Sequence, residues 1–325
     1  MRAMAYTLVL GVVIAAAGGC GRQPDIATPK SSPSRVVPTA MDQPSKVETD
    51  PAKLLFRALV FRDVGEVTKI LDAHPELVNK QVNKTYPLWV ASESQSLALV
   101  RAVVERGADL KVRSKDNQTI LWAAVTADDL DTVKYLVGKG ADVKALQDDK
   151  QSLLWAAPSK AMAEYLLAAG IDPKMKDANG DTALHQACRH SHADVVEVLL
   201  DRGLDIEAKG HWNMPPLHAA ASTLTGEPRA VVNLLLQRGA NINARGFEGH
   251  TVIHECAFYN RLPMAEMLLS RGAEPDLKDD KGRTPLDIAY IAGKADRVRM
   301  INLLIKHGAG EGRPDGILLP VPKDE

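Results

Sequence analysis

Histidine is the residue type in this chain that most strongly suggests metal or acid–base chemistry. His185, His218 and His254 each follow a Thr or Pro by three residues. A zinc site needs its ligand nitrogens about 2 Å from one ion, whereas neighbouring packed helices lie roughly 8–10 Å apart. Histidines on successive helices therefore cannot share a metal ion. His190 and His192 are close to His185 in the sequence, but residues two apart on a helix diverge, so we predict no metal site.

Other catalytic and cofactor-binding signatures are missing from the sequence. The chain contains no Gly-rich phosphate loop, no HExxH motif and no recognisable pair of nucleophile and base. Its 40 Lys and Arg residues are balanced by 41 Asp and Glu residues, for a net charge of −1. Nucleic-acid affinity depends largely on basic side chains that neutralise phosphates. We therefore predict no catalytic residues, no cofactor and no nucleic-acid partner.

The elements that position these residues are predicted to be helices. Aromatic residues make up only 4% of a chain that is 45% hydrophobic, so the core must be mostly aliphatic, which favours packed helices over a β-sandwich. Leu- and Val-rich stretches end at glycines, as expected where a helix closes with a left-handed residue. These glycines are separated by 33, 30, 33, 36, 33 and 36 residues, which indicates an internal repeat: Gly107, Gly140, Gly170, Gly203, Gly239, Gly272 and Gly308.

A second landmark precedes each of these glycines. Thr suits the N-cap of a helix and Pro suits its first turn. The clearest copies are Thr182-Ala183-Leu184-His185, Pro215-Pro216-Leu217-His218, Thr251-Val252-Ile253-His254 and Thr284-Pro285-Leu286-Asp287, and degenerate copies end at Trp89, Trp122 and Trp155. With this motif and its period of about 33 residues, the sequence resembles the ankyrin-repeat family.

The resemblance implies an all-α ankyrin-repeat solenoid, built from helix–turn–helix units with β-turn fingers. A weaker copy starts near Leu54, so we count about eight repeats and place the repeat domain at residues 52–310. One repeat is shortened at Pro158, and another carries an insertion at residues 223–228. Members of the family bind proteins through their fingers and the concave face of their first helices, which implies a non-enzymatic binding module. We expect a monomer.

The slot of the recurring histidine differs between the two halves of the chain. The resemblance implies that the histidines hydrogen-bond one repeat to the next. Trp89, Trp122 and Trp155 occupy the same slot in three earlier repeats. We expect them to form a buried or half-buried ladder that stiffens the N-terminal half, with ligand stacking as the alternative.

Two of the three cysteines belong to the predicted repeats. Cys188 and Cys256 are two repeats apart, which corresponds to roughly 20 Å at ordinary helix spacing. A disulfide needs Cα atoms within about 7 Å. We therefore predict two buried free thiols.

The N-terminal residues 1–19 have the pattern of a signal peptide. Arg2 precedes an apolar stretch at residues 4–17, too short to cross a bilayer comfortably and suited to a signal-peptide core. The segment Ala17-Gly18-Gly19-Cys20 resembles the lipobox of bacterial lipoproteins, which implies lipidation of Cys20; an ordinary signal peptide with an incidental Cys is the alternative. Gly21 stands where inner-membrane lipoproteins carry Asp, so the resemblance points to a lipid anchor in the bacterial outer membrane, facing the periplasm.

Segments of low complexity flank the predicted repeats. Residues 20–51 contain the lipidation candidate and a stretch rich in Pro, Ser and Thr, which we interpret as a flexible linker. The C-terminal tail, residues 311–325, contains the apolar run 317–319. It either caps the last repeat or is disordered.

Aromatic residues indicate where a partner binds. Neighbouring fingers carry Trp212 and Phe247, which we expect to be exposed, and the next first helix presents Phe258 and Tyr259. Four rings on one stretch of a chain poor in aromatics indicate an interface hot spot. In the alternative, the insertion at residues 223–228 folds over the rings and buries them. The predicted partner-binding residues are Trp212, Phe247, Phe258, Tyr259, His211, Arg189 and His190.

The function predicted from these features is a membrane-anchored periplasmic module that binds a protein partner. One form of this function is a scaffold that recruits an envelope protein, and the alternative is an immunity-type inhibitor of a secreted toxin. A small-ligand binder or an enzyme ranks last, because no motif or pocket signature supports it.

Overall fold

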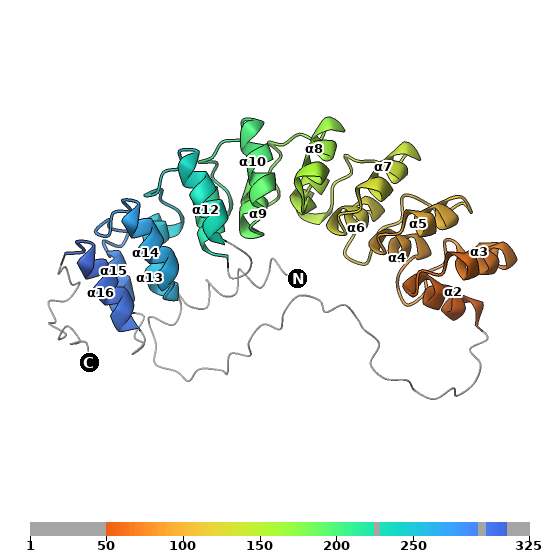
Figure 1. The fold of residues 1–325 in the computed structure, drawn as a ribbon, viewed down its shortest axis with the longest axis horizontal. Helices are drawn as coiled ribbons and strands as arrows, with labels where there is room; N and C mark the ends of the chain where they lie inside the picture. Colours follow the sequence, from red (N-terminus) through yellow and green to blue (C-terminus); the bar gives the residue numbers. More distant parts are fainter. Residues whose placement is uncertain (1–49, 224–227, 292–296, 311–325) are drawn as a thin grey trace, which may run out of the picture. The chain divides into compact units, whose positions relative to one another are not determined.

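Pairs of short helices account for most of the chain that can be described. The computed structural model describes residues 50–223, 228–291 and 297–310. The predicted signal peptide, Cys20, nearly all of the linker, most of the insertion and the C-terminal tail lie outside these residues. Figure 1 shows the helix pairs following one another in chain order.

Each pair consists of a first helix, a short connection and a second helix. The first helices are α2 (Pro51–Val60), α4 (Pro87–Glu93), α6 (Ile120–Thr126), the 3-10 turn η4 (Leu153–Ala156), α9 (Ala183–Arg189), α11 (Pro216–Ala221), α13 (Val252–Tyr259) and α15 (Pro285–Ile291). The second helices are α3 (Val64–Ala73), α5 (Leu97–Val104), α7 (Leu130–Gly138), α8 (Lys160–Ala168), α10 (Ala193–Asp201), α12 (Pro228–Gln237), α14 (Leu262–Ser270) and α16 (Val298–Lys306). These eight pairs are the eight expected repeats, and η4 is the first helix that Pro158 was predicted to shorten.

The core is a row of aliphatic side chains from every pair. The residue four positions before each repeat glycine is fully buried, at 0% exposure, in all seven repeats that have the glycine: Val103, Leu136, Leu166, Leu199, Leu235, Leu268 and Leu304. Burying such a side chain stabilises the fold by about 1.5–3 kcal/mol. First helices pack on first helices and second helices on second helices of the next pair, so each pair covers the apolar face of its neighbour.

The glycines end the second helices as predicted. All seven have φ between 75° and 96°, a region that side chains with a Cβ atom rarely adopt. The N–H of the following residue returns to the helix, as in the 2.9 Å bond from Ala240 N to the carbonyl of Leu235. This closure is the C-terminal motif that glycine permits.

The start of the second helix differs between the two halves. In the first four pairs an Asp or Ser side chain accepts an N–H of the first turn: Asp63, Ser96, Asp129 and Ser159. Arg261 and Arg297 occupy this position in the last two pairs, where neither side chain caps its own helix. Arg261 instead donates to the carbonyls of Ala221 and Ser222, at the end of the preceding first helix. Arg297 does the same to the pair before its own, so the later repeats are capped across the repeat boundary.

Candidate functional site

The fingers that carry Trp212 and Phe247 are the tight 3-10 turns η5 (His211–Asn213) and η6 (Phe247–Gly249). Trp212 has φ 53° and ψ 32°, in the left-handed region. Elsewhere in the fingers this conformation is taken by residues such as Asp149 and Asn117. A bulky residue there is an outlier that costs about 1–3 kcal/mol of backbone strain, and such strain clusters at functional sites. The finger therefore holds Trp212 in a backbone conformation that tryptophan disfavours.

Three rings from two neighbouring fingers meet at these tips. The centroid of the His211 ring lies 4.3 Å from that of Trp212, and Trp212 lies 5.5 Å from Phe247. All three side chains are half-buried, whereas we expected Trp212 and Phe247 to be exposed. Part of their surface is covered because the rings pack on one another. We call His211, Trp212 and Phe247 the finger cluster.

Asp181 holds the base of the finger cluster. One carboxylate oxygen, Oδ1, accepts the backbone N–H of His211 at 2.8 Å, and the other, Oδ2, accepts from the guanidinium of Arg189 at 2.6 Å. The backbone of Gly210 approaches so closely that a Cβ atom there would lie 2.1 Å from Asp181 Oδ1. Arg189 is thus joined to the finger through this buried carboxylate. Arg189 therefore positions the finger instead of facing a partner directly. Asp181 was not among the predicted site residues.

Phe258 and Tyr259 form a separate pair at the end of α13. Their ring centroids are 5.0 Å apart in an edge-on arrangement, and Phe258 also packs against the core. The guanidinium of Arg261 lies 5.2 Å from the centroid of the Tyr259 ring, and the carbonyl of Phe258 accepts a bond from Arg297. The ring of Phe258 contacts Tyr259 and, among the described residues, no ring of the finger cluster. The rings of His190 and His192 stack with their centroids 5.6 Å apart. The expectation that they diverge was wrong, because His190 caps the end of α9 and His192 caps the start of α10, so the two do not share a helix. The predicted site therefore divides into three groups.

The recurring histidines link consecutive repeats, as predicted. The Nε2 atom of His185 lies 3.1 Å from the carbonyl of Met214, that of His218 lies 3.0 Å from the carbonyl of His250, and that of His254 lies 3.1 Å from the carbonyl of Arg283. All three side chains are fully buried. Burial lowers the pKa of His218 and of His254 to about 4, so both are neutral at pH 7 and donate through Nε2.

His218 lacks one bond that its counterparts make. The Nδ1 atoms of His185 and His254 each accept the N–H of the Thr three residues earlier, at 3.1 Å. Pro215 stands in that place before His218 and has no N–H, so Nδ1 of His218 is buried without a hydrogen-bond partner. The neighbouring Glu255 has an oxygen, Oε1, 3.9 Å from His218 Nε2. Burial raises the pKa of Glu255 to about 8.

Two of the three tryptophans in the first half belong to the buried core, and the third packs against it. Trp89 and Trp155 are buried, at 9% and 8% exposure, and Trp122 is half-buried against the core. Trp89 donates to the Glu93 carboxylate at 3.0 Å. This agrees with the predicted half-buried series.

The two described cysteines are free and buried, as predicted. Burial raises the pKa of the Cys256 thiol to about 12. The same cause raises the pKa of the Cys188 thiol. Neither thiol is a candidate nucleophile, because the thiolate is the reactive form.

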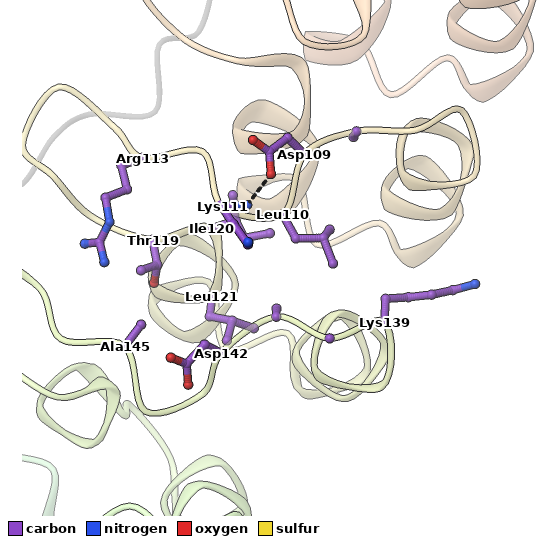
Figure 2. Close-up of a pocket in the computed structure, with 13 residues that line it drawn as sticks. Asp109, Leu110, Lys111, Arg113, Thr119, Ile120, Leu121, Lys139, Asp142 and Ala145 are labelled. Carbon is purple, nitrogen blue, oxygen red and sulfur yellow. Dashed lines mark hydrogen bonds between the residues drawn. The ribbon is translucent and has the colours of Figure 1, made fainter.

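A shallow cleft of about 560 Å³ lies between the second and third pairs, away from every predicted site residue. Figure 2 shows Asp109 bonded to the backbone of Lys111, and Lys139 extending away from the other labelled side chains. The Arg113 guanidinium is bonded to the carbonyls of Asn117 and Leu146, at 2.7 and 3.1 Å. The cleft is lined mostly by loop residues, and these charged groups either bond to nearby backbone or extend away from the other lining side chains. They do not converge on a common point, as polar groups in a small-molecule site do.

Within residues 50–223, 228–291 and 297–310, no three His, Cys, Asp or Glu side chains are grouped so that they could hold a metal ion. Across the same residues, each helix is too short or too polar to cross a bilayer.

Basic side chains recur beneath the fingers in a slot that the sequence analysis overlooked. Lys176, Lys209 and Arg245 each lie six residues before the Thr or Pro of the repeat motif. The ammonium of Lys176 donates to the carbonyl of Lys209 at 3.0 Å, and that of Lys209 donates to the carbonyl of Arg245 at 3.0 Å. Their regular spacing was the signal that could have revealed them. We call these three residues the basic row.

Comparison with protein families finds ankyrin repeats along the described chain. The ankyrin-repeat model matches in three copies, at residues 55–147, 153–246 and 217–315. The transient receptor potential cation channel subfamily A member 1 homolog of Caenorhabditis elegans is 33% identical over 117 residues, which is 35% of this chain and 9% of that protein. The human SH3 and multiple ankyrin repeat domains protein 2 is 28% identical over 247 residues, 74% of this chain and 11% of that protein. The chain thus spans about a tenth of the length of these relatives.

Solved structures show the same architecture. The ankyrin repeat domain of Bcl-3, a member of the IkappaB protein family, matches with a TM-score of 0.51 and 29% identity, covering 69% of this chain and all of that one. The human ASB11 ankyrin repeat domain matches with a TM-score of 0.60 and 21% identity, covering 70% of this chain and all of that one. The second likeness shows the fold alone.

Proposed function

The chain belongs to the ankyrin-repeat family, and we propose that it binds a protein partner through the finger cluster while an N-terminal lipid holds it at the periplasmic face of a bacterial outer membrane. Ankyrin repeats generally bind proteins. The specific surface, the anchor and the compartment are the parts we propose.

The observation that carries the binding proposal is the strained placement of Trp212. The left-handed backbone of Trp212 lowers the stability of the fold. Its ring does not offset this cost by entering the core, because it lies against His211 and Phe247. Clustered, half-exposed aromatic rings are the usual centre of a protein interface. Arg189, joined to the cluster through Asp181, positions the finger. Phe258 and Tyr259 provide a second contact region, and His190 provides a third.

The binding surface is tested by photo-crosslinking from the intact protein. A benzophenone side chain at Asn213 lies next to Trp212, whereas one at Lys150 lies at the corresponding turn position of a finger without rings. We expect Asn213 to capture one protein from native membranes and Lys150 to capture none. Equal capture from both positions, or none from Asn213, would remove the support for the finger cluster.

The captured protein also separates the two forms of this function. A resident envelope protein supports the scaffold. A protein captured only when a toxin-delivering strain is present supports the immunity-type inhibitor.

The anchor proposal rests on the sequence Ala17-Gly18-Gly19-Cys20. Acyl chains on Cys20 would contribute about 0.8 kcal/mol for each buried methylene, enough for stable attachment with more than one chain. Cys20→Ala is expected to move the protein from the membrane to the soluble fraction and to abolish labelling by palmitate. Membrane attachment without labelling in both forms would refute the anchor.

A further inference from the structure

Two members of the basic row directly precede the fingers that carry the aromatic rings, and Lys176 precedes the neighbouring finger. Lys209 immediately precedes Gly210 of the Trp212 finger, and Arg245 immediately precedes Gly246 of the Phe247 finger. The ammonium of Lys209 reaches the carbonyl of Arg245, so the two fingers are tied together at this level. The cations and the rings therefore belong to one continuous stretch of surface.

The basic row makes no close ion pair with a carboxylate of the described residues. Among the described residues, neither Lys176 nor Lys209 forms an ion pair, and Arg245 has only a long contact of 3.9 Å to Asp280. The carboxylates of these fingers are engaged elsewhere: Asp181 binds Arg189 and the backbone of His211, and Glu248 pairs with Lys281 at 2.7 Å. A hydrogen bond to a carbonyl uses one N–H of the Lys ammonium but does not neutralise its positive charge, which remains available to attract an acidic partner.

We propose that the finger cluster and the basic row together bind an acidic segment of a protein, one that places an aromatic or large aliphatic side chain against Trp212 and Phe247. The inference rests on the proposed function and specifies the chemistry of the partner. The rings supply an apolar anchor, and the cations supply complementary charge that selects an acidic segment over a basic one.

The test uses the full-length protein and a phage-displayed library of random peptides. Peptides are selected on the unaltered protein and depleted on Trp212→Ala/Phe247→Ala, so that only ring-dependent binders remain. Their affinities are then measured for Lys176→Gln/Lys209→Gln/Arg245→Gln, in which glutamine keeps a donor but removes the charge. The matched control is Lys80→Gln/Lys115→Gln/Lys150→Gln, which removes the same charge from exposed positions of earlier fingers.

The expected binders are rich in Asp and Glu and contain an aromatic or large aliphatic residue. Removing the basic row should weaken them about tenfold, as expected for three surface charge pairs, and the control should leave them unchanged. Ring-dependent binders without acidic residues, bound equally by all variants, would overturn the inference and leave the proposed function intact. Failure to find any ring-dependent binder would overturn both.

Discussion

The two halves of the repeat domain have one fold, but the second half contains links between pairs that the first half lacks. In the first half, amide side chains bridge consecutive pairs: Asn79 accepts the N–H of Asp109 at 2.8 Å, and Gln147 accepts that of Thr119 at 2.7 Å. The second half has such an amide link too, since Asn243 accepts the N–H of Glu274 at 3.0 Å, but it adds bridges from buried histidines and from two arginines. Amides do not titrate and histidine does, so mild acid should act more strongly on the second half than on the first.

The largest expected effect is a loss of stability in acid. His218 and His254 have folded pKa values of about 4 against about 6.5 when unfolded. A lowered pKa means that the unfolded chain binds more protons between these values, so stability is complete above pH 6.5 and is lost as the pH falls toward 4. From pH 7.5 to 5 the two groups together should lower the free energy of unfolding by about 4 kcal/mol.

This loss is best measured by urea denaturation in the Glu255→Gln background. The contribution of Glu255 to the pH dependence of stability has the opposite sign, because its raised pKa removes stability as the pH rises from 4.5 to 8. The substitution removes this contribution and leaves that of the histidines. Hydrogen exchange should show that α11 and α13 lose protection in acid before α4 and α6. Simultaneous loss in both halves would contradict the comparison.

Glu255→Gln should itself stabilise the protein at pH 7.5, by about 4 kcal/mol. The reason is that folding at this pH requires a proton on the buried Glu255 carboxyl, which an amide does not need. The gain should disappear at pH 4.5, where the unfolded Glu is half protonated. A gain that is independent of pH would point to packing and not to ionisation.

Arg297→Ala tests capping across the repeat boundary. The Arg297 guanidinium donates to the carbonyls of Ala257, at 2.7 Å, and of Phe258, and a charged donor to buried carbonyls contributes about 2 kcal/mol. Asp129→Ala in the first half removes a local cap and should cost only about 1 kcal/mol. Equal losses from the two variants would erase this distinction.

Pro215→Thr should repair the incomplete histidine link, with a gain of about 1 kcal/mol. Pro215 has φ −78° and ψ 167°, close to the φ −102° and ψ 170° of Thr182, so a Thr fits without strain. Its N–H would then reach His218 Nδ1. In a His218→Leu background, Pro215→Thr should not raise the free energy of unfolding. A rise in that background would show that the gain does not come from a bond to His218.

The fold was predictable because its signals are local and periodic. Each repeat glycine ends a second helix, and Pro158 shortens η4, as its place in the motif predicted. The proximity of Trp212 and Phe247 was also predictable, since they occupy nearly the same slot in consecutive fingers.

The parts of the site that were missed depend on side-chain reach. Asp181 joins Arg189 to the backbone of His211, and Arg261 reaches a carbonyl 40 residues earlier. Such contacts depend on rotamers and on the angle between pairs, which repeat spacing does not specify. For the same reason the sequence did not show that Phe258 packs on Tyr259 and not on the rings of the finger cluster.

The most direct test of the account measures stability and partner capture together in Trp212→Gly/Phe247→Ala. Because Gly relieves the strain of the left-handed turn and both rings lie outside the core, the free energy of unfolding should stay the same or rise by up to about 3 kcal/mol, while crosslinking from position 213 is lost. A loss of several kcal/mol with capture preserved would show that the rings serve the stack, and would contradict the assignment of binding to the fingers.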